Sequence, residues 1–423
     1  MRHIQPEVLI GASPFGGAHA RRGLAIGQAL SALRPDAHVR YVSGGPDVEM
    51  FRRAGVEVED LLLFEPYPAS DGRLNRRKLR SLFIRSELQH AARIASLIRR
   101  TKPDLVLLDE MLAAVFAAKA MGAKVGFVTH APTFPRPAWL GDLDLALATT
   151  FINKIRQRAI LSSDLAFYVG AEHHLPEPNL WPWVRRHMEV VGLLTKCDRP
   201  SRTPKEALNW YGLSPQKPMV VVTVGALAIG RYLLEAAIRA WPLVQPDAQL
   251  LVVCGASIRP EQLPAPPDRV RVVGLVDDLP SYLAAANLAV VQAGLTTVGE
   301  CLALGTPMIC VPIKWHREQE NNARYAAEAG GATVIERDRI TPALLAGEID
   351  KMLARPRAVE VLRPDPDAAP ELEQGGADGA ARALSRLLAP PAILRFPSLR
   401  PITAGVAVCD DPPAVSDSAA AVC

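Results

Sequence analysis

The feature that most constrains the fold of this chain is a regular alternation of short apolar segments with longer segments of helical period. The short segments are bounded by Gly, Asp and Pro, and the longer ones are rich in Ala, Leu and Arg. This alternation is typical of strand–helix units in a mostly parallel sheet. The predicted strands of the first half are Glu7–Gly11, Val39–Ser43, Leu105–Leu108, Val125–Thr129, Leu165–Val169 and Glu189–Val191. Those of the second half are Met219–Val224, Gln249–Cys254, Val270–Val273, Leu288–Val291, Met308–Val311 and Thr333–Ile335.

A break separates the two sets of units. The segment Thr195–Pro204 is polar and contains Pro, which is the composition of a hinge, and 423 residues are enough for two domains. We therefore predict an α/β protein with two Rossmann-like domains facing each other across a cleft, at residues 1–196 and 207–389, joined by a linker at 197–206. The last predicted helix, Ala380–Leu388, either stays with the second domain or crosses back onto the first. Residues 390–423 are rich in Pro and small residues and are predicted to be a disordered tail.

Composition and charge exclude several classes of protein. The chain is 49% hydrophobic and 22% charged, which is the composition of a globular protein and not of a disordered or fibrous one. The formal net charge is only +4, so nucleic-acid binding is not the expected function. None of the six cysteines forms a CxxC pair or has zinc-ligand spacing, so we expect reduced thiols. The sequence has no signal-peptide pattern and no apolar run long enough for a transmembrane helix, which predicts a cytoplasmic protein.

Each half opens with a strand, a small-residue turn and a helix. The two segments are VLIGASPFGGAHARRGLAIGQAL (8–30) and MVVVTVGALAIGRYLLEAAI (219–238). Such a turn lets the backbone approach a phosphate or sugar, and the helix start presents unpaired N–H groups. The alternative is a tight strand-to-helix connection with no ligand. Neither segment contains GxGxxG, which argues against a nicotinamide dehydrogenase.

A sharper signal lies in residues 272–330. The strand Leu288–Val291 is followed by the turn Ala293–Thr297 and then by a helix, an arrangement suited to a diphosphate without a metal. Glu300 follows one helical turn later, where its carboxylate can accept bonds from vicinal hydroxyls such as those of a ribose; the alternative is a solvated helix glutamate. Glu318 and Gln319 come after the next strand and are suited to sugar hydroxyls.

These residues resemble the GT-B nucleotide-sugar glycosyltransferases, most closely family 28, which includes the lipid-II-forming N-acetylglucosaminyltransferases, and also family 1. The matching residues are Val276-Asp277-Asp278, Gly294, Thr296, Thr297, Glu300, Gly305, Pro307, Glu318-Gln319 and Asn322-Ala323. The resemblance implies that the donor base lies against Leu275 and Val276, and the diphosphate at Gly225, Gly294, Thr296 and Thr297. It places Glu300 at the ribose, Glu318 and Gln319 at the donor sugar, and Gly17 among the donor-binding residues.

The turn of the first half resembles the acceptor-side loop of the same family, in which Gly-Gly-His precedes a helix that begins Gly-Leu-Ala. Here Ala18 is inserted between Gly17 and His19, whereas the spacing from His19 to the Gly-Leu-Ala sequence is kept. His19 is the candidate general base, since an imidazole titrates near neutral pH; the alternative is a histidine that only caps or packs. Asp109 either supports His19 or caps a helix, and His130 either binds the acceptor or lies in a loop without such a role.

By resemblance, the predicted function is transfer of a sugar from a nucleoside-diphosphate sugar, such as a UDP-sugar, to an acceptor, with inversion. The donor is a co-substrate, and neither a cofactor nor a metal is expected, because the Asp-x-Asp triplets at 142–144 and 365–367 do not follow a strand suitably. A small molecule or natural product is the expected acceptor. The alternatives are a lipid-linked acceptor at the membrane surface, a nucleotide-sugar 2-epimerase and a non-catalytic sugar-nucleotide-binding subunit. The basic segment Arg73–Arg85 is either a solvated helix face or a site for an anionic acceptor or peripheral membrane contact.

Overall fold

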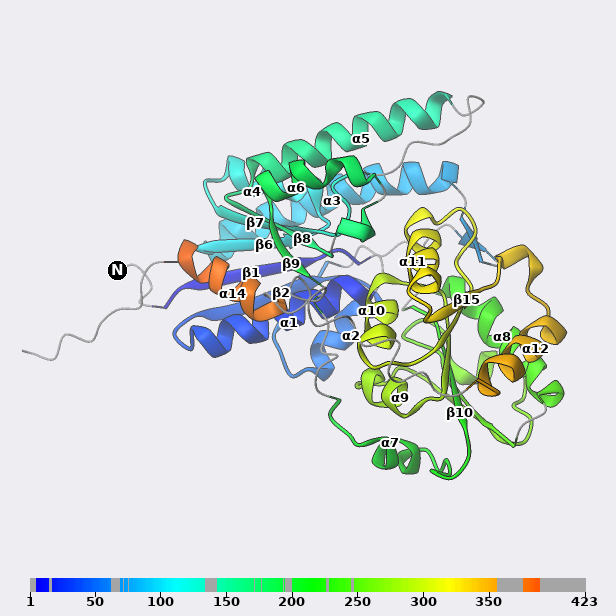
Figure 1. The fold of residues 1–423 in the computed structure, drawn as a ribbon. Helices are drawn as coiled ribbons and strands as arrows, with labels where there is room; N and C mark the ends of the chain where they lie inside the picture. Colours follow the sequence, from blue (N-terminus) through cyan, green and yellow to red (C-terminus); the bar gives the residue numbers. More distant parts are fainter. Residues whose placement is uncertain are drawn as a thin grey trace, which may run out of the picture. The chain divides into compact units, whose positions relative to one another are not determined.

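A parallel sheet organises the first half of the chain in the computed structural model (Figure 1). Within the described residues this sheet has seven strands in the order β3-β2-β1-β6-β7-β8-β9. The strands are β1 (Glu7–Ala12), β2 (His38–Ser43), β3 (Val58–Asp60), β6 (Leu105–Asp109), β7 (Lys124–Thr129), β8 (Leu165–Val169) and β9 (Glu189–Gly192). They are apolar throughout because the sheet packs on both faces: Ile10 lies in one core and Leu9 in the opposite one.

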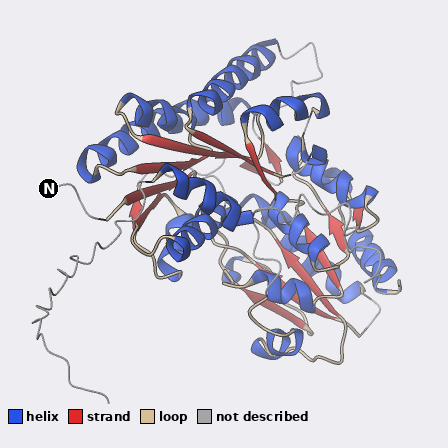
Figure 2. Cartoon of the chain, turned by 60° about the vertical axis from the view of Figure 1, so that its left-hand side comes forward, coloured by secondary structure: helices blue, strands red, loops and turns tan. Residues whose placement is uncertain are grey.

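Helices cover both faces of this sheet (Figure 2). They are α1 (Gly17–Leu33), α2 (Pro46–Arg53), α3 (Arg76–Thr101), α4 (Leu112–Ala120), α5 (Leu143–Ser162) and α6 (Trp181–His187). A short antiparallel hairpin, β4 (Ala69–Ser70) and β5 (Arg73–Leu74), precedes α3. The hairpin contacts the second half, since the backbone N–H of Lys314 donates to the carbonyl of Gly72 at 3.0 Å.

The second half has a parallel sheet of its own, with six strands in the order β12-β11-β10-β13-β14-β15 among the described residues. These are β10 (Met219–Thr223), β11 (Gln249–Val253), β12 (Val270–Val273), β13 (Leu288–Val291), β14 (Met308–Cys310) and β15 (Ala332–Val334). The helices around it are α7 (Pro204–Trp210), α8 (Arg231–Ala240), α9 (Leu279–Ala285), α10 (Leu295–Ala303), α11 (Arg317–Glu328) and α12 (Pro342–Leu353). Side chains again alternate between two cores, with Val220 in one and Val221 in the other.

The last helix, α14 (Gly376–Leu387), crosses back onto the first half. It packs on α1 and β9, and Ala380, Ala383 and Leu384 are buried in the same core as Ile10. Arg386 also pairs with Glu189 at 2.8 Å. The helix therefore belongs by packing to the first sheet although it follows the second one in sequence (Figure 1).

The structure describes residues 5–14, 17–61, 69–70, 72–74, 76–133, 143–170, 172–175, 177–192, 194, 200–225, 228–244, 247–355 and 376–388. The predicted tail at 390–423, residues 197–199 of the predicted linker and the Asp365–Asp367 triplet lie outside these residues, and so does Asp142. The described part of the predicted linker includes the start of α7. All twelve predicted strands are present, with ends within two residues of the prediction. The sequence analysis missed β3 and the β4–β5 hairpin.

Candidate active site

The order of the strands determines where the site lies. In each sheet the first strand of the chain lies in the middle, and the next two strands add to one side of it. The following strand then pairs with the other side of the first strand. The strand order therefore reverses between β1 and β6 in the first sheet and between β10 and β13 in the second. Ligands of parallel α/β sheets bind at the carboxyl ends of the strands next to this reversal. His19 follows β1 and Asp109 ends β6, while Gly225 follows β10 and Gly294 follows β13.

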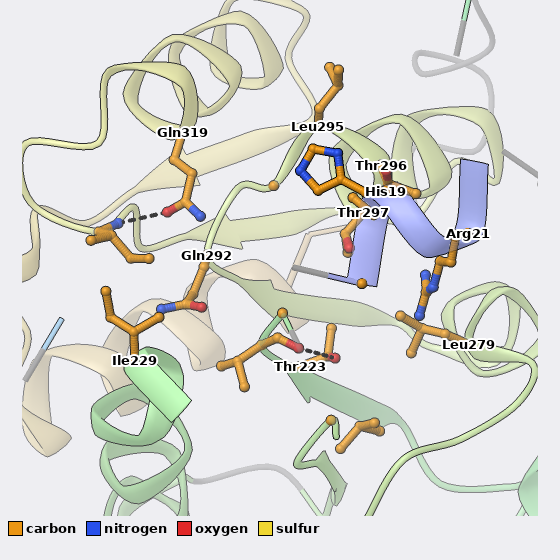
Figure 3. A pocket seen from close by; sticks show the side chains of 18 of the residues that line it. His19, Arg21, Thr223, Ile229, Leu279, Gln292, Leu295, Thr296, Thr297 and Gln319 are labelled. Atoms are coloured by element: carbon orange, nitrogen blue, oxygen red, sulfur yellow. Dashed lines mark hydrogen bonds between the residues drawn. The ribbon is translucent and has the colours of Figure 1, made fainter. Parts of the chain in front are cut away.

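One pocket is lined by residues from these loops of both halves (Figure 3). Almost all predicted site residues line this pocket: Gly17, His19, His130, Gly225, Leu275, Val276, Gly294, Thr296, Thr297, Glu318 and Gln319. The two others, Asp109 and Glu300, are buried behind it and contact pocket residues. The topology therefore brings together residues as far apart in the sequence as Gly17 and Gln319.

His19 is held by a buried carboxylate and a buried guanidinium. Its Nδ1 lies 2.8 Å from Oδ1 of Asp109. Arg22 donates to both oxygens of Asp109, from Nε and from Nη2, each at 2.7 Å, and its Nη2 is also 2.7 Å from Nδ1 of His19. Burial alone would raise the pKa of Asp109, but Arg22 and then His19 outweigh it and lower that pKa. Asp109 is thus an ionised group at neutral pH. Nδ1 of His19 faces both an acceptor, Asp109, and a donor, Arg22, so its hydrogen-bond role depends on the tautomer of the ring.

His130 forms a second, separate charge cluster. Its Nδ1 lies 3.2 Å from Glu110 and its Nε2 lies 3.1 Å from Glu318, so it joins a carboxylate of the first half to one of the second. Glu110 also accepts from buried Arg156 and from the Thr129 hydroxyl, each at 2.5 Å. Burial would lower the pKa of His130, but the two carboxylates raise it to about 10. His130 is therefore an imidazolium at neutral pH, and its ring centroid is 6.2 Å from that of His19.

The start of α10 points into the pocket. Its N-cap is Gly294, which provides no side chain to occupy the first-turn amides. A Cβ added to Gly294 would meet nothing within 4 Å, and the same holds for Gly225, so the backbone is open on the pocket side at both turns. Ala293 has a φ of 60°, which is uncommon for a residue with a side chain, and Asn322 fixes this turn by donating to the Ala293 carbonyl at 3.1 Å. The arrangement suits an anion bound at the helix N-terminus.

Glu300 lies one turn further along α10 and is only 2% exposed. Its Oε1 is 3.6 Å from Nη1 of Arg21, which comes from α1 in the other half. Its Oε2 has no hydrogen-bond partner in the described part of the chain. Burial raises the pKa of Glu300, and the attraction of Arg21 does not fully offset this. The carboxylate therefore has an unused acceptor oxygen beside the pocket.

The loop after β14 and the first turn of α11 supply the remaining polar groups. His316 caps α11, and burial lowers its pKa, so this imidazole is neutral. Gln319 is turned onto its own loop, where its Oε1 accepts from the backbone N–H of Ile313 at 2.9 Å (Figure 3). Burial would raise the pKa of Glu318, but its contact with His130 lowers it. Glu318 and Gln319 thus line the pocket as an anion and a neutral amide.

Sequence reasoning missed several residues of the site. They are Arg21, Arg22, Glu110, Thr223, Gln292 and His316. Two of them carried a local signal: Arg22 is three positions after His19, so both share one helix face, and Glu110 directly follows Asp109 at the end of β6. The partner of Arg21 lies in the other half of the chain, which no local pattern indicates.

The structure also bears on metal ligands, thiols and membrane-spanning helices. The described residues contain no group of three or more His, Cys, Asp or Glu side chains that could hold a metal ion. Cys254, Cys301 and Cys310 are buried and form no disulfide among the described residues, and the other cysteines lie outside the described residues. No helix in the described ranges is both long and apolar enough to cross a membrane. Of the basic segment, Arg73 pairs with Asp338 at 2.6 Å, whereas the side chains at 76–83 are not described.

Comparison with known proteins extends these observations. Residues 219–371 match the glycosyltransferase family 28 C-terminal domain. An uncharacterized glycosyltransferase of Methanosarcina mazei is 27% identical over 248 residues, which are 56% of this chain and 62% of that protein. A UDP-N-acetylglucosamine–N-acetylmuramyl-(pentapeptide) pyrophosphoryl-undecaprenol N-acetylglucosamine transferase of Mycolicibacterium vanbaalenii is 28% identical over 403 residues, 89% of this chain and 90% of that one.

Among solved structures, the glycotransferase of kitacinnamycin superimposes with a TM-score of 0.67 at 16% identity, covering 91% of this chain and all of that one. The likeness extends over both sheets and identifies the fold as GT-B. Residues 219–371 thus match the C-terminal domain of glycosyltransferase family 28, within a chain that has the GT-B fold and whose relatives are named as glycosyltransferases.

Proposed function

We propose that the protein transfers a sugar from a nucleoside-diphosphate sugar to a small-molecule acceptor, with inversion at the anomeric carbon and without a bound metal. In this proposal the half built on the second sheet holds the donor, and the half built on the first sheet holds the acceptor. The observation that carries it is that His19, paired with Asp109, lines the same pocket as the amide-bearing start of α10 (Figure 3). A base from one half and an anion site from the other thus lie on the same pocket.

The donor-side assignment is supported by the character of the groups along the second sheet. The open backbone at Gly225 and Gly294 and the hydroxyls of Thr296 and Thr297 suit a diphosphate. The unused oxygen of Glu300 suits a ribose hydroxyl. Glu318 and Gln319 lie in the first turn of α11, where they suit the hydroxyls of the donor sugar, and the backbone at Leu275 and Val276 suits the base.

The proposed reaction is a direct displacement. In the tautomer whose Nδ1–H donates to Asp109, Nε2 of His19 takes the proton of the acceptor hydroxyl. As that proton leaves, the acceptor oxygen bonds to the anomeric carbon on the face opposite the diphosphate. The bond from the anomeric carbon to the diphosphate oxygen breaks, and its electron pair departs with the nucleoside diphosphate. The α10 amides stabilise the charge that develops there, and Asp109 stabilises the imidazolium.

The acceptor class has two candidates. The Mycolicibacterium relative is named for a lipid-linked acceptor, whereas the similar solved structure belongs to a natural-product glycosyltransferase. We favour a small natural-product acceptor, with a lipid-linked acceptor as the alternative. In either case the imidazolium of His130, close to the His19 ring, would orient a polar group of the acceptor or the sugar.

The test is a turnover assay with UDP-, dTDP- and GDP-sugars and both acceptor classes, read by product mass and release of nucleoside diphosphate. We expect His19→Ala to lower kcat by roughly 10²- to 10⁴-fold, as loss of a general base does, while the Kd for nucleoside diphosphate stays within about twofold. His38→Ala is the matched control, because His38 pairs with Glu7 on β1 and does not line the pocket. Unchanged turnover in His19→Ala would remove the assigned base.

Two further results would replace the proposal. Conversion of the donor sugar to its epimer without an acceptor would indicate an epimerase. Binding of nucleoside diphosphates without turnover of any donor by the parent protein would indicate a binding subunit. Formation of a glycosylated lipid and not of a glycosylated small molecule would select the alternative acceptor.

A further inference from the structure

Arg21 reaches across the pocket from α1 to α10. Its Nη1 lies 3.6 Å from Oε1 of Glu300, and its side chain is 32% exposed while that of Glu300 is 3% exposed. Figure 3 shows Arg21 among the side chains that line the pocket, with Thr296, Thr297 and Leu279. The residue that covers the predicted ribose-binding carboxylate therefore comes from the opposite half of the protein.

We propose that Arg21 is a donor-binding residue that changes partner: it pairs with Glu300 until the donor ribose takes that carboxylate, and it then contacts the diphosphate of the donor. The inference rests on the proposed function, because it assumes a nucleoside diphosphate at α10. It adds a residue of the acceptor half to the donor site.

The Arg21–Glu300 pair is loose. A charge-assisted hydrogen bond between a guanidinium and a carboxylate measures about 2.7–2.9 Å, which is shorter than the 3.6 Å separation here. Oε2 of Glu300 also has no hydrogen-bond partner in the described part of the chain. By contrast Arg22, the next residue, makes two 2.7 Å bonds to Asp109 and is only 4% exposed. Arg22 is therefore fixed, whereas Arg21 is free to exchange its partner.

The contact between Arg21 and Glu300 is not compatible with a ribose bound to Glu300. The vicinal hydroxyls of a ribose donate two hydrogen bonds, and the two carboxylate oxygens of Glu300 can accept both. Since Glu300 is almost fully covered, Arg21 has to move aside before the hydroxyls reach it. The displaced guanidinium then lies one helical turn from the amides of Leu295 and Thr296, where the diphosphate is expected.

The start of α10 alone does not balance the charge of a diphosphate. A helix N-terminus offers the equivalent of only about half a positive charge, which is less than a diphosphate carries. Among the described cations that line the pocket, Arg22 is committed to Asp109, and His130 to Glu110 and Glu318. Arg21 is the lining guanidinium with the weaker pair, and its five N–H donors in a planar fork match two phosphate oxygens at once.

The test measures the Kd of Arg21→Met for the best-binding member of a panel of UDP, dTDP and GDP, and for the corresponding nucleoside, by calorimetry. Loss of a charge-assisted contact is expected to weaken diphosphate binding roughly 10- to 100-fold. Nucleoside binding is expected to stay within about twofold or to tighten, because Glu300 is no longer covered. Arg21→Gln is measured as well, so that the test does not depend on one variant folding, and circular dichroism checks both.

Arg53→Met is the matched control. Arg53 also pairs across the two halves, with Asp277 at 3.5 Å, but neither residue lines the pocket. We expect this variant to bind the diphosphate like the parent. Diphosphate affinity within twofold of the parent in Arg21→Met, or equal weakening of diphosphate and nucleoside, would overturn the inference. If the parent itself binds none of the three diphosphates, the proposed function fails instead.

Discussion

Replacing Arg22 with Met tests how the buried charges beneath His19 are balanced. Arg22 and Asp109 are 4% and 3% exposed and share two hydrogen bonds of 2.7 Å. Removing one partner of a buried ion pair costs about 3–5 kcal/mol, because the other charge stays buried and unpaired. We therefore expect Arg22→Met to lower the free energy of unfolding by about this amount at pH 7. Urea denaturation of the parent and the variant gives the difference.

The sign of the pH dependence follows from Asp109. In the parent its pKa is lowered, so this carboxylate stabilises the fold above its unfolded pKa, and the contribution is lost as pH falls through the folded pKa. In Arg22→Met the burial of Asp109 is no longer offset by the guanidinium, so the folded pKa rises and the carboxyl can take up a proton at mildly acidic pH. The stability difference between parent and variant is therefore expected to be smaller at pH 5 than at pH 7, by on the order of 1 kcal/mol per pH unit.

A double variant separates this account from simple loss of packing. Arg22→Met combined with Asp109→Asn removes both charges, so it is expected to be more stable at pH 7 than Arg22→Met alone. Two results would show that Arg22 does not offset the buried charge of Asp109. One is a decrease of less than about 1 kcal/mol in the free energy of unfolding of Arg22→Met. The other is a decrease in the double variant equal to the sum of the decreases in the two single variants.

Two further predictions concern other buried positions. A Cβ on Gly27 would overlap the Tyr41 hydroxyl, so Gly27→Ala is expected to lower the melting temperature, at a cost of about 1–3 kcal/mol; Gly347→Ala, where a Cβ meets nothing within 4 Å, is the control and should be neutral or stabilising. Asp47 is 1% exposed and burial raises its pKa to about 7, so folding binds its proton more tightly and stability falls as pH rises from about 4 to 7. The free energy of unfolding of Asp47→Asn should therefore exceed that of the parent by up to about 4 kcal/mol at pH 8 and by little at pH 4. Urea denaturation at both pH values measures the difference, and an equal difference at pH 4 and pH 8 would contradict the prediction.

The fold was largely predictable because its signal is local. A strand buried on both faces has to be apolar along its length, as in the LVLL sequence that begins β6, and such runs are visible in the sequence. The missed strand β3 has the sequence VED and is an edge strand of three half-buried residues, so it has neither an apolar run nor an alternation. The hairpin β4–β5 has only two residues in each strand, which is too short for any periodicity.

The site was predictable only in part for a related reason. Gly294, Thr296, Thr297 and Glu300 follow one another on a single turn and helix, so their spacing in the sequence is also their spacing in space. Because Ala18 is inserted before His19, the sequence did not determine where the imidazole of His19 lies. In the structure, Nδ1 of His19 contacts Asp109. The catalytic and binding roles of all these residues stay predictions.

What the sequence could not indicate is how charges are matched across the pocket. Glu300 and Glu318 belong to the second half, and the cations that face them, Arg21 and His130, come from the first. A buried carboxylate whose partner lies on another domain is stable only while the two halves are together, or while a ligand takes the place of the partner. A donor that binds Glu300 competes with Arg21, whereas His130 keeps a second carboxylate, Glu110, on its own half. Donor binding should therefore loosen the Arg21–Glu300 pair and leave the His130 cluster intact, as one of the contacts that hold the halves together.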